Sequence, residues 1–141
     1  MPYQKSESGN TVTLTCDGQT LAAAYIDAAH GLFDVLADGS KIRGDVRQEI
    51  VIQAADAHTL LAEWLKELLS RVAQTGMVYS DFEIFSIQKV GTQHVLTGAI
   101  YGETADSSRH TLAQNVSLQE KSVTCDEKAG SALCTFSLSR S

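Results

Sequence analysis

DAHTLLAEWLKELLSRV, residues 56–72, holds the clearest structural pattern in the chain and decides the fold class. Its apolar residues recur at steps of three and four, which is the spacing of one face of an α-helix. The predicted inner face consists of Leu60, Leu61, Trp64, Leu65, Leu68, Leu69 and Val72. Asp56 and Thr59 are both suitable N-cap residues, and Gly76 ends the helical region. We therefore expect an amphipathic helix whose Trp64 packs into the core.

A second stretch with helical spacing runs from Leu21 to Leu36, with Thr20 as its predicted N-cap and Gly39 as its stop. Period-two patterns predict strands around these helices. They cover residues 11–16, 49–54, 81–90, 94–103, 115–125 and 132–139. The order predicts an α+β fold in which two amphipathic helices pack on a mostly antiparallel sheet. A chain of 141 residues is expected to form a single domain, residues 1–141.

Composition restricts the classes of function. The net charge of −6 argues against direct nucleic-acid binding, which depends on many Lys and Arg contacts to phosphates. No run approaches the roughly 18 apolar residues of a membrane helix, and the polar N-terminus lacks the apolar run of a signal peptide. These features predict a cytoplasmic protein without membrane contact. Cys16, Cys125 and Cys134 are odd in number and lack C-x-x-C spacing, which favours free, buried thiols.

The decapeptide YGETADSSRH, residues 101–110, is the part of the sequence richest in catalytic residue types. Glu103, Asp106, Arg109 and His110 could support acid–base chemistry. A structural interpretation is equally open: Gly102 serves a turn, and Glu103 and Arg109 close a loop as an ion pair. Phosphate-binding loops, H-E-x-x-H and G-x-S-x-G are missing, and the four histidines show no metal-ligand spacing.

Three phrases in order resemble the archease family. They are GQTLAAAYIDAAHGLFDVLAD (18–38), HTLLAEWLKELL (58–69) and YGETADSSRH (101–110). The resemblance implies a duplicated strand–helix–strand–strand module. It also implies a protein that is not an enzyme but a non-catalytic cofactor, assisting the guanylylation of RtcB-type RNA ligases in tRNA splicing or RNA repair. Glu103, Arg109 and His110 would then belong to a loop that contacts the partner.

The chain departs from the archease pattern at its charged positions. Archeases have a His-Thr-Ala-Asp phrase on the first strand, and the Asp that helps to bind a divalent cation such as calcium falls on Thr11. The family's Lys after the Arg-His loop falls near Ser117. Its final Asp falls on Ser137 or Ser139. Because hard cations prefer carboxylate oxygen ligands, we expect these positions to form a degenerate metal site with no metal cofactor.

Two functions of different class follow. The first is a divergent archease-like cofactor that still binds an RtcB-type RNA ligase. The second is a metal-independent binding module on the same scaffold without a ligase role. A weaker third interpretation is a small hydrolase that uses Glu103 and His110.

Overall fold

A computed structural model describes residues 3–37, 42–105 and 116–139. Within them the chain forms two helices and seven strands. In chain order these are β1 (Tyr3–Ser8), β2 (Thr11–Gly18), α1 (Leu21–Leu36), β3 (Val46–Ala54), α2 (Ala57–Thr75), β4 (Met77–Val90), β5 (Gln93–Thr104), β6 (Ser117–Lys128) and β7 (Ser131–Ser139). All strand pairings among these residues are antiparallel, so the predicted α+β class is confirmed.

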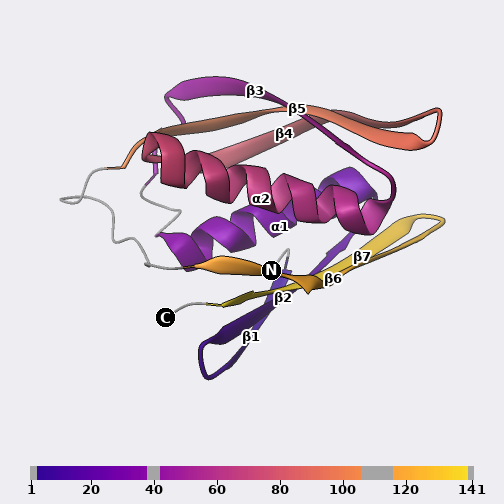
Figure 1. Ribbon diagram of the computed structural model, residues 1–141, viewed down its shortest axis with the longest axis horizontal. Helices are drawn as coiled ribbons and strands as arrows, with labels where there is room; N and C mark the ends of the chain where they lie inside the picture. The colour runs from indigo at the N-terminus through magenta and orange to yellow at the C-terminus, as the bar shows by residue number, and fades with distance from the viewer. Residues whose placement is uncertain (1–2, 38–41, 106–115, 140–141) are drawn as a thin grey trace.

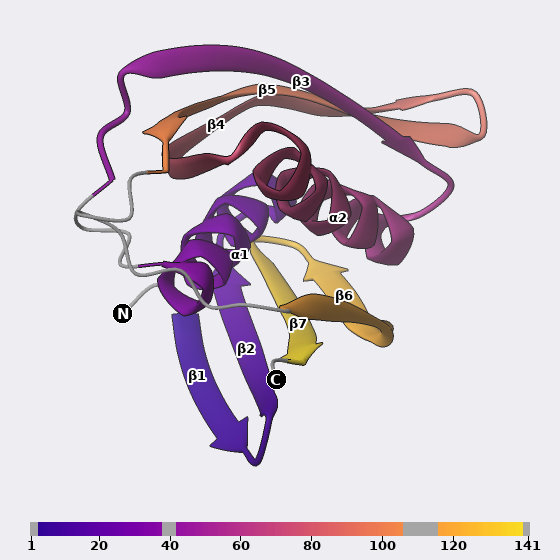
Figure 2. The same cartoon turned by 60° about the vertical axis from the view of Figure 1, so that its left-hand side comes forward.

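The strands divide into two sheets with both helices between them (Figure 1). One sheet has the order β1-β2-β7-β6 and the other has the order β3-β5-β4. Figure 2 shows the same three layers from another side. The sequence predicted helices on a single sheet. A second sheet is possible because α1 contacts β2 and β7 on one side and β4 on the other, so it is apolar over a wide arc.

Each sheet is built around the three strands of a strand–helix–strand–strand unit, and the two units have the same strand order. β3, α2, β4 and β5 are consecutive in the chain, and their strands lie in the order β3-β5-β4. β2, α1, β6 and β7 form an equivalent unit in the order β2-β7-β6, and the first unit is inserted between α1 and β6. β1 extends this second sheet beside β2. The duplicated module implied by the resemblance is therefore present.

The helix ends follow from local hydrogen bonding. Asp56, and not Thr59, is the N-cap of α2, because its Oδ1 accepts the Thr59 N–H at 2.8 Å. Gly76 ends α2 in the left-handed conformation with φ 72°. Thr20 caps α1 as predicted, since its Oγ1 accepts an N–H of the first turn at 3.1 Å. The predicted stop at Gly39 lies outside the described residues.

Trp64 lies in the core, as the helical spacing predicted. Its side chain is fully buried, and its Nε1–H donates a hydrogen bond of 3.0 Å to the main-chain oxygen of Tyr25 in α1. Its ring meets Phe82 of β4 edge to face, with 6.3 Å between centroids. Trp64 thus links α2 to α1 and to the second sheet. Neither helix of the described residues is long and apolar enough to cross a membrane.

β1 is the strand that the periodicity did not predict. Only Tyr3 of its six residues is buried, and the other five are exposed. An edge strand that is exposed on both faces has no alternation of apolar and polar residues to detect. Its position beside β2 comes from main-chain pairing, which the side-chain pattern does not record.

Candidate functional site

The residues that we predicted to stand at the charged positions of the archease pattern lie side by side in the structure. Thr11 of β2 is paired with Ser139 of β7, and Ser139 is paired with Ser117 of β6. Facing residues of antiparallel strands have Cα atoms about 4.5–5.5 Å apart. Three segments that are far apart in the sequence therefore form one row across the sheet. Of the two candidate positions on the last strand, Ser139 is paired with Thr11, and Ser137 is paired with Thr13.

A second row lies beside the first and completes a polar patch. It consists of Thr13, Ser137 and Gln119, again on β2, β7 and β6. The Thr13 and Ser137 hydroxyls are hydrogen-bonded at 2.8 Å, and Gln119 Nε2 donates to the Ser139 hydroxyl at 2.6 Å. We refer to the six residues of the two rows as the hydroxyl patch.

The hydroxyl patch lies on the face of the sheet that points away from the helices. Successive side chains of a strand point to opposite faces. Val12 and Leu14 of β2 are fully buried against the helices, so Thr11 and Thr13 point outward and are half-buried. Sequence reasoning did not include Thr13, although the alternating phrase TVTLT already places it on the same face as Thr11.

β6 is irregular next to the hydroxyl patch. Its pairing with β7 shifts between Gln119 and Thr124, and the intervening Lys121 is exposed. The pattern placed the family's lysine near Ser117. The strand carries a lysine four residues further on, which sequence reasoning did not consider. β6, at the edge of the sheet, therefore carries the positively charged side chain of Lys121.

The donor set of the hydroxyl patch does not fit a hard divalent cation. Ca²⁺ and Mg²⁺ sites use several oxygen ligands and usually carboxylate charge, whereas the patch offers neutral hydroxyls and one amide. Two of these hydroxyls, those of Thr13 and Ser137, already bond each other. In the parts of the chain that the structure describes, no group of three or more His, Cys, Asp or Glu is arranged to hold a metal. Loss of metal binding remains a prediction.

Glu103 lies apart from the hydroxyl patch, on the other sheet. It is the penultimate residue of β5, and its Oε2 accepts the Arg43 N–H at 2.5 Å. Its proposed partners Arg109 and His110 lie outside the described residues. The carboxylate therefore ties β5 to the segment before β3.

Gly102 has a different role from the turn that the sequence predicted. It lies inside β5, where a Cβ atom would come within 2.0 Å of the Val78 main-chain oxygen. The turn interpretation is wrong for this residue. A glycine is needed because β4 approaches closely where its pairing shifts between Tyr79 and Asp81.

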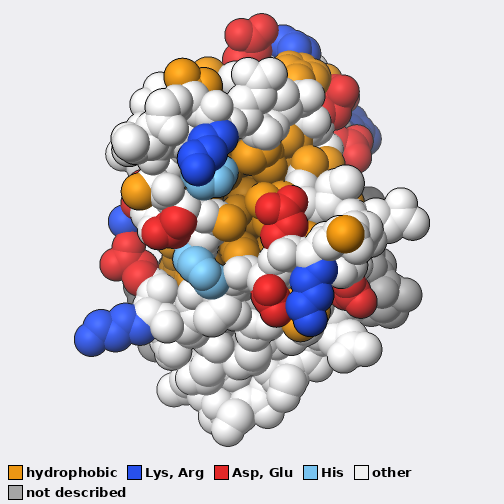
Figure 3. All heavy atoms as spheres, turned by 90° about the vertical axis from the view of Figure 1, so that its right-hand side faces the viewer, with side chains coloured by type: hydrophobic (Ala, Val, Ile, Leu, Met, Phe, Trp, Pro, Cys, Tyr) orange, Lys and Arg blue, Asp and Glu red, His pale blue; other side chains and the backbone are white. Residues whose placement is uncertain are grey.

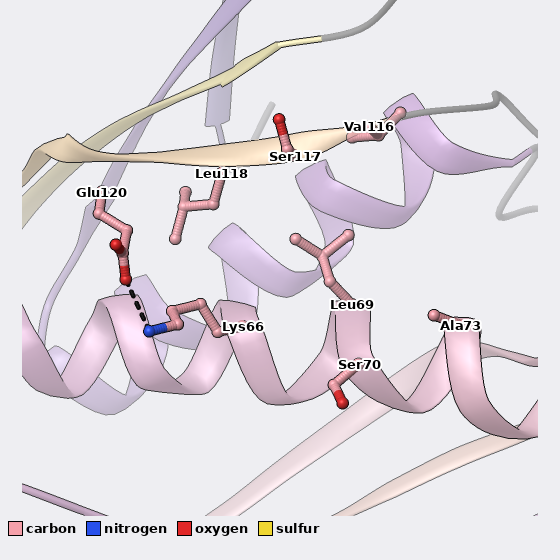
Figure 4. Close-up of a pocket in the computed structure, with 8 residues that line it drawn as sticks. All are labelled: Lys66, Leu69, Ser70, Ala73, Val116, Ser117, Leu118 and Glu120. Carbon is pink, nitrogen blue, oxygen red and sulfur yellow. Dashed lines mark ion pairs between the residues drawn. The ribbon is translucent and has the colours of Figure 1, made fainter.

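A groove of about 450 Å³ lies between α2 and β6, next to the hydroxyl patch. Leu69 and Leu118 point toward each other inside it, and Lys66 and Glu120 form an ion pair of 2.6 Å at one end (Figure 4). Ser117 lines the groove, but its hydroxyl points away from α2. An apolar groove and a neutral polar face thus meet at the start of β6.

A second hollow of about 410 Å³ opens where α1 begins and the β4–β5 hairpin ends. Leu21, Ile87 and His94 contribute to its lining, together with Lys89 and Glu127. Figure 3 shows this side of the molecule, with apolar side chains exposed between histidine and charged side chains.

Comparison with known proteins agrees with this architecture. A profile of the archease protein family matches residues 6–129. Protein archease of Pyrococcus furiosus is 35% identical over 99 residues, which are 70% of this chain and 69% of that protein. Protein archease of Methanopyrus kandleri is 30% identical over 116 residues, 82% of each chain.

The fold is also shared with a solved structure. The solution structure of protein 1598 from Methanobacterium thermoautotrophicum covers 98% of both chains with a TM-score of 0.81 and 20% sequence identity. At that identity the similarity shows a common fold. The family profile extends over most of the sequence, and two curated archeases are at least 30% identical. The chain belongs to the archease family.

Proposed function

We propose that this chain is a non-catalytic protein cofactor that assists the guanylylation of an RtcB-type RNA ligase, in tRNA splicing or RNA repair. Membership of the archease family supports a protein cofactor role in general. The hydrolase interpretation needs Glu103 together with His110; Glu103 accepts a main-chain N–H, and His110 lies outside the described residues. A cofactor of this kind would act through contact with its partner.

The hydroxyl patch is the observation that carries this proposal. Thr11, Ser139 and Ser117, to which the resemblance assigns charged positions of the family pattern, meet in one row across the sheet. We infer that hydroxyls replace this charge at Thr11, Ser117 and Ser137 or Ser139, and the Ser137 hydroxyl is hydrogen-bonded to that of Thr13. A face of this kind offers a partner directed hydrogen bonds and shape. It needs no divalent cation to complete it.

The second candidate is a metal-independent binding module with no ligase role. The neutral character of the hydroxyl patch favours it, because a metal-assisted step would have lost its ligands. The two functions predict the same surface but different partners. The ligase assay separates them.

The test measures guanylylation of the cognate RtcB-type ligase with labelled GTP in single-turnover conditions, over a range of added protein. We expect acceleration that is unchanged by millimolar Ca²⁺. Thr13→Lys should abolish the acceleration, because it places a charge and a long side chain in the hydroxyl patch.

Thr97→Lys is the matched control. Thr97 is a half-buried threonine on the outer face of the other sheet, and its hydroxyl bonds Ser86 Oγ at 2.9 Å, as Thr13 bonds Ser137. This variant should remain active. No acceleration by the unmodified chain with an active ligase rejects the ligase role and leaves the binding module. Equal loss in both variants rejects the patch as the contact.

A further inference from the structure

The three cysteines form one row beneath the helices. Cys16 of β2 is paired with Cys134 of β7, and Cys134 is paired with Cys125 of β6. All three side chains are buried and face the interior. The odd number and the spacing suggested isolated structural thiols. The strand register instead brings together three residues that the sequence separates.

Cys125 and Cys134 are in direct contact. Their sulfur atoms lie 3.2 Å apart, and the Cys134 S–H donates to Cys125 Sγ. Cα atoms of directly paired strand residues are about 4.5–5.5 Å apart, which lies within the range of about 4.4–6.8 Å that disulfides span. The two strands can therefore accept a covalent link without moving apart.

The surroundings make Cys125 the more acidic thiol of the pair. The hydrogen bond from the Cys134 S–H lowers the pKa of Cys125, against the effect of burial. The same contact and burial raise the pKa of Cys134. Burial raises the pKa of Cys16 to about 12. The thiolate, which is the reactive form of cysteine, is thus favoured at Cys125.

Cys125 is also the thiol nearest to solvent. β6 is the edge strand of its sheet, and Cys125 is 7% exposed, whereas Cys16 and Cys134 are 0% exposed. His58 of α2 holds the strand in place, because its Nδ1 accepts the Cys125 N–H at 2.8 Å. Such restricted access favours a small oxidant over a bulky one.

We propose that Cys125 and Cys134 are a peroxide-reactive pair that forms a reversible disulfide between β6 and β7. The Cys125 thiolate attacks one oxygen of hydrogen peroxide, the O–O bond breaks, and hydroxide leaves, so that Cys125 becomes a sulfenic acid. The Cys134 sulfur then attacks the Cys125 sulfur. The S–O bond breaks, water leaves with the Cys134 proton, and one S–S bond forms. A dithiol reductant reverses the reaction.

The full-length protein is treated with increasing hydrogen peroxide, denatured, alkylated and analysed by mass spectrometry. We expect only one of the three thiols to be alkylated, so that the protein carries two fewer alkyl groups than the reduced control, together with a Cys125–Cys134 peptide pair. Dithiothreitol should restore all three thiols. The oxidised protein should melt several degrees higher, because the link constrains the unfolded chain.

Variants assign the order of the steps. Cys16→Ala should still form the disulfide. Cys134→Ala should leave a Cys125 sulfenic acid that dimedone traps, whereas Cys125→Ala should give no adduct at Cys134 at the same dose. Three alkylatable thiols after treatment of the unmodified protein, or a disulfide that contains Cys16, overturns the proposal. This peptide map decides the pairing even if a variant fails to fold, and it is independent of any ligase.

Discussion

Restoring the acids tests the interpretation of the hydroxyl patch directly. The double variant Thr11→Asp/Ser139→Asp places two carboxylates on facing positions of β2 and β7. At a separation of about 5 Å in a water-exposed site, their repulsion costs about 1 kcal/mol. Without metal, the variant should therefore melt a few degrees below the unmodified protein.

Calcium should reverse this loss. The row ends at the strand termini, where the Ser117 and Gln119 side chains and main-chain oxygens can add ligands. A ligand at a hundred times its Kd adds about 2.7 kcal/mol of stability. For a domain of this size that amounts to an increase in Tm of roughly 10 °C. The unmodified protein should show no shift in millimolar Ca²⁺.

The assay is differential scanning calorimetry with and without Ca²⁺, at fixed ionic strength. The matched control is Thr15→Asp/Thr135→Asp, another facing pair on the same strands and the same face. It pays the same repulsion but lies in the middle of the sheet, where main-chain oxygens are used in strand pairing. A shift of equal size in the control, or none in a folded Thr11→Asp/Ser139→Asp variant, refutes the placement of the metal ligands.

Three further predictions concern the stability of the fold. Gly102→Ala should lower the free energy of unfolding in urea by about 3 kcal/mol or more, because main-chain atoms must move to admit the Cβ. Gly76→Ala should lower it by only about 1 kcal/mol, because its Cβ would meet open space and only the φ of 72° is unfavourable. A larger loss in Gly76→Ala than in Gly102→Ala contradicts the close approach of β4 to Gly102. Trp64→Phe should lower the free energy of unfolding by about 2 kcal/mol in the same measurement, since the main-chain oxygen of Tyr25 loses its hydrogen bond and a cavity remains. A loss below about 0.5 kcal/mol contradicts a stabilising role of Trp64 in the core. The hydrogen bond from the Thr59 N–H lowers the pKa of Asp56. The ionised cap therefore stabilises the fold above the unfolded-state pKa of about 4, and this contribution is lost as the pH falls through the lower folded-state pKa. Asp56→Asn should make the loss of stability at acid pH less steep, and an unchanged pH dependence contradicts the ionic role of the cap.

Local patterns in the sequence predicted much of the secondary structure. The stripes around Trp64 and along Leu21–Leu36 became α2 and α1, because helical spacing reports which face is buried. The N-cap at Thr20 was also readable, since capping depends on neighbours in the chain. The turn assigned to Gly102 was wrong because its constraint comes from β4, across the sheet.

The sequence by itself predicted both helices, the strands other than β1 among the described residues, and which face of each is apolar. That hydroxyls stand at the family's acidic positions remains a prediction. Only the tertiary structure decided which strands are neighbours. That choice placed Thr11 beside Ser139 and Cys125 against Cys134, and it separated Glu103 from the hydroxyl patch. The physical reason is the sequence separation over which each interaction acts. Periodicity and helix caps depend on residues a few positions apart, whereas strand register arises from packing two sheets on opposite sides of one helical layer.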